Sequence, residues 1–221
     1  MRTIEHSMDD LAYSILIEIK EEIFPKLCKE YGITPTLHTP ETFDEYIAEE
    51  EGYVGTDDLI NEIIQDKIED NLIVTKYTID ETNKFIYRMY VPLFNIEKLV
   101  MTNLDLENKS TLNLDGLLDF LELSLRHEFG YILYQNDYIK KAGINAFDWF
   151  VNRFNNALDE YSDYCKSAID TYDNDEDFYI DVVKKYYEID MVKRINEFAG
   201  IHVPDFISKE LFYKHQIEIS E

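Results

Sequence analysis

The sequence is poor in glycine, proline, cysteine and basic residues. Seven glycines and five prolines among 221 residues supply neither a glycine-rich phosphate loop nor a flexible linker that would divide the chain. The two cysteines, Cys28 and Cys165, stand far apart and outside any Cys/His cluster, so we expect buried free thiols. The chain also lacks a membrane-length apolar run and the features of a signal peptide, which predicts a cytoplasmic protein.

Basic residues are outnumbered by acidic ones to an unusual degree. The chain carries 21 Lys and Arg against 46 Asp and Glu, a net charge of −25. A field of this sign repels nucleic acid phosphates and anionic membranes, and it attracts basic surfaces. We therefore expect no direct nucleic acid or membrane binding. The charge serves either solubility or the imitation of a polyanion toward a basic protein partner.

The composition still supports a folded core. Hydrophobic residues make up 45% of the chain and aromatic residues 14%, which is enough to bury a sizeable apolar interior. With no linker in the sequence, we predict one domain over residues 1–221.

The N-terminal 70 residues read as helices. Apolar residues recur at helical spacing from Ser7 to Tyr31, which predicts one long helix that Pro25 kinks and Gly32 ends. A loop follows from Ile33 to Thr42. Two acidic helices are then expected, over 41–50 and 56–69.

The middle and the end of the chain combine a hairpin with more helices. Two β-rich runs around a polar turn predict a hairpin over 72–91, and residues 96–101 form either a strand or a helical turn. A central helix over 114–135 and C-terminal helices over 146–199 follow, the latter as two segments, 146–171 and 176–198, before a short tail. The expected class is α+β, predominantly α-helical, with a small antiparallel sheet and a central helix.

The central helix carries a dipeptide typical of zinc peptidases. Such enzymes place two His four residues apart, so that both reach one metal, and a Glu beside the first His takes a proton from the bound water. Here His127 and Glu128 are present, but Tyr131 stands where the second His would be.

Two windows of the sequence resemble the compact zincin-like metallopeptidases with a His-Glu-Phe-Gly-His core, including short phage-encoded members and the ImmA/IrrE-like group. The first window is the run from Ser124 to Gly130 around the dipeptide. The second ends in Asn196-Glu197-Phe198-Ala199 and is similar to a downstream family pattern, Glu-x-x-Ala-Asn-x-Phe-Ala. The leading Glu of that pattern is the family's third metal ligand, and Val192 takes its place here.

The resemblance implies a zincin-like fold with a degenerate metal site. His127 would be a vestigial ligand and Glu128 a vestigial general base, whereas Tyr131 and Val192 occupy lost ligand positions. Three further residues are candidates for supporting the site: Asn196, Asp137 and Glu188. Asp137 lies ten residues after His127, where some zincins keep a ligand, and Glu188 lies one turn before Val192. The expectation is a site without zinc or any other cofactor.

Three functions follow from these observations. The first is a catalytically inactive zincin-like protein that acts by binding another protein. The resemblance to phage-encoded members of the family implies a phage source and the host cytoplasm. The second is an acidic nucleic acid mimic that inhibits a nuclease or defence protein. The third is an active zinc metallopeptidase with a non-standard ligand set. The acidic run Asp173–Asp177 lacks the pattern of a calcium loop and is expected to form a solvated helix cap.

Overall fold

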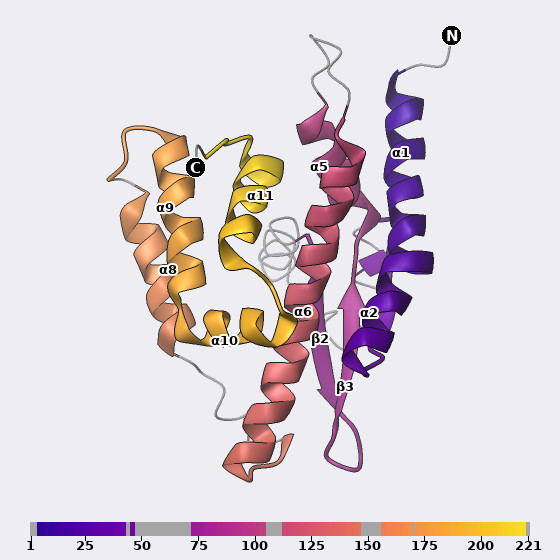
Figure 1. The fold of residues 1–221 in the computed structure, drawn as a ribbon, viewed down its shortest axis with the longest axis vertical. Coiled ribbons are helices and arrows are strands. Elements are labelled where there is room, and N and C mark those ends of the chain that lie inside the picture. The colour runs from indigo at the N-terminus through magenta and orange to yellow at the C-terminus, as the bar shows by residue number, and fades with distance from the viewer. Residues whose placement is uncertain are drawn as a thin grey trace, which may run out of the picture. The chain divides into compact units, whose positions relative to one another are not determined.

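The computed structural model describes residues 4–42, 45–46, 72–104, 112–146, 156–169 and 171–219. It is mostly helical with one small sheet (Figure 1), so the α+β class is confirmed. Contacts group the chain into two compact units, one of residues 1–77 and 86–128 and one of residues 78–85 and 129–221. The boundary falls within the central helix, between Glu128 and Phe129. Of the expected acidic helix over 41–50, the structure describes only residues 41–42, which form a bend, and 45–46, which are helical. The expected helix over 56–69 lies outside the described residues, and the single domain stays a prediction.

The N-terminal helix of the first unit is interrupted just before Pro25. It consists of α1 (Ile4–Glu18), a π-helical turn η1 (Ile19–Ile23) and α2 (Phe24–Tyr31). In that turn the Phe24 N–H donates to the Ile19 carbonyl, five residues back. The wider turn accommodates a proline ring that would collide with an ordinary α-helical turn. Gly32 ends α2 at φ 67°, as the sequence predicted.

The sheet has three strands in the order β1-β3-β2. The predicted hairpin is present as β2 (Val74–Ile79) and β3 (Phe85–Tyr90), closed by a turn in which the Asp80 N–H donates to the Lys84 carbonyl at 2.9 Å. The third strand is β1 (Thr36–His38), which pairs with β3 in parallel. The sheet is therefore mixed, and the predictions of a purely antiparallel sheet and of a loop over 33–42 were wrong.

An ion-pair cluster joins α2 to the central helix, α6 (Leu114–Ala142). The Arg126 guanidinium donates to both carboxylate oxygens of Glu30, at 2.6 and 2.9 Å, and to Glu122 on its own helix at 2.9 Å. Lys26 also donates to Glu122. These paired carboxylates raise the pKa of Arg126, and the cluster fixes α2 on α6. Residues 96–101 belong to a helix, α5 (Leu93–Asn103), which packs against α1.

The second unit is a group of helices around α9 (Asp175–Glu188). This helix contacts α8 (Asn156–Ala168), α10 (Asp190–Ala199) and α11 (Val203–His215), as Figure 1 shows. The prediction of one helix over 176–198 was wrong, because Ile189 adopts an extended ψ of 127° and divides it. The prediction of a short C-terminal tail was also wrong, since α11 forms most of that segment. Cys165 and, in the first unit, Cys28 are free thiols but are half-buried rather than buried.

The acidic run Asp173–Asp177 begins α9, as predicted. The Asn174 side chain caps the helix by accepting a hydrogen bond from the Asp177 N–H at 2.8 Å, and the run is exposed. No helix in the described ranges is long and apolar enough to cross a membrane.

Candidate functional site

The zinc-peptidase dipeptide lies near the middle of α6, which continues seven residues beyond the predicted end at 135. His127, Glu128 and Tyr131 are half-buried. Because α6 is unbroken here, His127 and Tyr131, four residues apart, project from the same face of the helix. His127 and Glu128 end the first unit, whereas Tyr131 belongs to the second.

Gly130 of α6 lies in close contact with α10. A Cβ atom added to Gly130 would lie 2.3 Å from the carbonyl oxygen of Ile195 and 2.8 Å from the Cβ of Ala199. Only a glycine permits this approach, since any side chain would collide with the backbone of α10. The second sequence window is thus packed directly on the helix of the first, at the glycine of the motif.

The second window is a buried helical face. Val192 is 0% exposed and Asn196 1% exposed. The Asn196 amide donates to the Val192 carbonyl at 3.0 Å, so its donor is used within α10. Gly200 at φ 65° ends the helix, and the Ile201 N–H donates back to the Asn196 carbonyl at 3.0 Å. The Asn196 side chain therefore makes a hydrogen bond that stabilises its own helix.

Asp137 and Glu188, the two carboxylates considered for supporting the site, pair with lysines on their own helices. Asp137 pairs with Lys141, one turn later on α6, at 2.8 Å. Glu188 is exposed and pairs loosely with Lys185 at 3.9 Å. Within the residues that the structure places, no group of three His, Cys, Asp or Glu could hold a metal ion. Of the three ligand positions that the resemblance implies, one is a buried Val and one a Tyr, so the residues present do not fit zinc.

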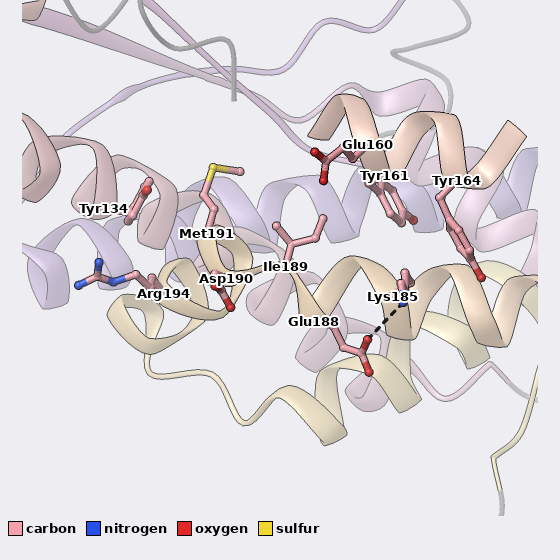
Figure 2. Close-up of a pocket in the computed structure, with 10 residues that line it drawn as sticks. All are labelled: Tyr134, Glu160, Tyr161, Tyr164, Lys185, Glu188, Ile189, Asp190, Met191 and Arg194. Atoms are coloured by element: carbon pink, nitrogen blue, oxygen red, sulfur yellow. Dashed lines mark ion pairs between the residues drawn. The ribbon is translucent and has the colours of Figure 1, made fainter. Parts of the chain in front are cut away.

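A pocket of about 700 Å³ opens in the second unit beside α10 (Figure 2). Helices α6, α8, α9 and α10 all contribute to it. Three tyrosines line it together with acidic, basic and apolar residues: Tyr134, Tyr161, Tyr164, Glu160, Glu188, Asp190, Lys185, Arg194, Ile189 and Met191. Glu188 is the only one of the candidate site residues from the sequence that reaches this pocket.

Hydrogen bonds to α9 hold two of the tyrosines in place. The Tyr161 hydroxyl donates to the Val182 carbonyl at 2.9 Å, and the Tyr164 hydroxyl donates to the Asp181 carboxylate. Burial raises the pKa of Tyr161, and the bond to Asp181 raises that of Tyr164. Both rings are therefore neutral surfaces at physiological pH.

Charged side chains lie around these rings. The Lys185 ammonium lies 5.5 Å from the centre of the Tyr164 ring, within the range of a cation–π contact. Asp190 pairs with Lys193 at 3.7 Å, yet its side chain is 99% exposed. Figure 2 shows Arg194 and Tyr134 at one end of the pocket, with Ile189 and Met191 between them and Glu160.

Sequence reasoning missed this pocket because its residues come from four helices and no motif links them. The one available signal was the Tyr-rich composition of the last hundred residues, with Glu160-Tyr161 and Tyr164 one turn apart. No family model, curated protein or solved structure matches this chain.

Proposed function

We propose that this protein is a catalytically inactive zincin-like protein that acts by binding another protein. The observation that carries the proposal is the position of Val192, fully buried on a helix seated against Gly130. The order of elements, a hairpin, a central helix and a later helix packed at the motif glycine, supports the zincin-like comparison.

The chemistry of the two replaced positions argues against metallopeptidase activity. Zinc in proteins takes thiolate, imidazole or carboxylate ligands, and a catalytic site uses three of them with water in the fourth position. Val192 has no donor atom, and its side chain is fully buried. A divalent ion placed beside this side chain would lose hydration without gaining a ligand.

The acidic composition supports a protein as the partner. A net charge of −25 favours association with basic surfaces and opposes contact with nucleic acid. The proposed partner is a protein with a basic surface. The resemblance to phage-encoded zincin-like proteins suggests the cytoplasm of a bacterial host as the place of action.

Zinc titration of the unmodified protein tests the inactive site. We expect no chelator-reversible rise in melting temperature when zinc is added, because a ligand stabilises a folded protein only if the folded state binds it. A zinc-dependent rise that disappears in His127→Ala would overturn the proposal and would favour an active enzyme with a non-standard ligand set.

A second candidate function, imitation of a nucleic acid, is favoured by the run of exposed carboxylates at the start of α9, Asp173 to Asp177. These charges are closely spaced and solvated, like those of a phosphate backbone. The test is inhibition of a panel of basic nucleases at low salt. Inhibition that persists at high salt would count against mimicry, because exposed charges are screened within about 8 Å at physiological ionic strength.

A further inference from the structure

The pocket of the second unit combines three features that recognise an organic cation. Aromatic faces of Tyr161 and Tyr164 attract a cation through the ring quadrupole. Carboxylates of Glu160 and Glu188 line the same pocket, and Glu160 lies next to Tyr161 (Figure 2). Apolar surface from Ile189 and Met191 suits the aliphatic stem of a lysine or arginine, whose charged head stays near the rim.

The chain's own lysine already uses one of these faces. Lys185 is exposed and pairs with Glu188 only at 3.9 Å, while its ammonium lies over the Tyr164 ring. This internal cation marks the position that a cation from outside would compete for. Glu160 differs from the other carboxylates of the pocket, because it has no ion-pair partner among the described residues.

Arg194 sets the direction in which a ligand would lie. It stands at the opposite end of the pocket from Tyr164, next to Tyr134 (Figure 2). A guanidinium has donors only, and it suits the carbonyl oxygens of a peptide backbone. A basic side chain near Glu160 with its backbone toward Arg194 would satisfy both ends.

We propose that this pocket binds a lysine or arginine side chain of the partner protein. The inference rests on the proposed function, since it assigns the partner's basic residue to one site on the acidic surface. The ligand is a cation carried on a peptide, and the experiment below distinguishes it from a free polyamine.

Methyl NMR of the protein labelled with ¹³C-methyl methionine provides a local measurement. Met191 lines the pocket, whereas Met89 and Met101 belong to the first unit and serve as internal controls; a Met191→Leu variant assigns the signal. The probes are the capped tripeptide Gly-Lys-Gly, the same peptide with norleucine in place of lysine, and spermidine. We expect the lysine peptide to shift the Met191 signal in a saturable way and the norleucine peptide to leave it unchanged.

Matched variants separate the pocket from the general charge of the surface. Glu160→Gln should lower the affinity for the lysine peptide about two- to fivefold, the range for one exposed charge pair. Glu197→Gln, an exposed carboxylate of α10 outside the pocket, should have no such effect. Lys185→Met should strengthen binding by removing the internal competitor. Lys184→Met, its exposed neighbour outside this pocket, is the control for charge alone.

Several results would overturn the inference. They are no response of Met191, an equal response to the norleucine peptide, a response to spermidine alone, or equal weakening by Glu160→Gln and Glu197→Gln. Each of these leaves the proposed function standing as long as the unmodified protein shows no zinc response. A zinc response would remove the proposed function whatever the peptide does.

Discussion

Two regions of the second unit meet on α10 and differ in almost every physical respect. On one face Val192, Ile195, Asn196 and Ala199 are buried. Ile195 and Ala199 lie against Gly130, and the Asn196 amide is bonded inside the helix. On the other, Asp190, Met191 and Arg194 border an open pocket. The first face is held by close packing, where small changes of volume are costly. The second consists of side chains that keep contact with water.

This difference separates a structural role from a binding role on a single short helix. The closed face contains the residues that resemble a peptidase, and the open face contains none of them. This division of roles predicts that substitutions on the closed face change stability, whereas substitutions on the open face change ligand binding alone.

The largest effect is expected from Val192→Glu. A carboxylate at this fully buried position should lower the free energy of unfolding by about 4 kcal/mol at neutral pH. Urea denaturation measures this loss. Lys193→Glu, one residue later and exposed, should change stability by no more than about 0.5 kcal/mol.

Zinc can then test the alignment of Val192 with the family ligand. In the double variant Tyr131→His with Val192→Glu, zinc should raise the melting temperature and chelator should reverse the rise, because a correct alignment would make His127 and the two new side chains three zinc ligands. The single variants should gain much less, and His127→Ala in the double variant should abolish the gain. A folded double variant whose melting temperature does not change with zinc would show that the alignment is wrong.

The next effect is expected from Gly130→Ala. In a helix this change normally stabilises, but here the new Cβ would meet the Ile195 carbonyl at 2.3 Å. We expect a loss of about 2 to 3 kcal/mol in urea denaturation. Ala199→Gly in the same chain should recover part of it by removing the contact at 2.8 Å. A gain in stability from Gly130→Ala would mean that α10 does not pack here.

A smaller effect, with a defined pH dependence, is expected from Tyr187→Phe. The Tyr187 hydroxyl donates to Glu210 at 2.6 Å, and its loss should cost about 1 kcal/mol at pH 8. Burial and the Glu210 carboxylate raise the pKa of Tyr187 well above 10.0. The unfolded chain therefore loses this proton first as the pH rises above about 10, and stability falls from that pH upward. The Phe variant should show a shallower fall between pH 9 and 11, and an unchanged slope would contradict the assignment.

The smallest effect on stability is expected from Glu160→Gln on the open face. The side chain is exposed, so the melting temperature should stay within about one degree of the unmodified protein, corresponding to less than about 0.5 kcal/mol. A larger loss would place Glu160 in the packing of the unit, and the contrast between the two faces would then fail.

Local signals explain the parts of the fold that could be predicted. Gly32 ended a helix, Pro25 disturbed one, and a polar turn between two β-rich runs produced the hairpin. The errors came from segments with weak local signals. The strand Thr36–His38 is short and lies between prolines, and α11 looked like a tail although Pro204 in its first turn and Lys214 in its last are ordinary helix signals.

The candidate site divides in the same way. The sequence identified His127, Glu128 and the replaced positions Tyr131 and Val192, because a motif is a matter of residue types at fixed spacing. It could not show that Asn196 bonds to its own helix or that Asp137 pairs with Lys141. These outcomes depend on which helix face is buried.

By itself, the sequence determined the acidic charge, the helical and hairpin segments, and the presence of Tyr131 and Val192 at the two positions where the zincin-like pattern has zinc ligands. These are properties of composition, spacing and local conformation. Only the tertiary structure decided that α10 rests on Gly130 and that four helices enclose the pocket beside it. The helix breaks at Ile189, where α10 turns away from α9, and no glycine or proline there predicts the break. Long-range packing chose that conformation, and contacts between segments distant in sequence leave no local pattern to read.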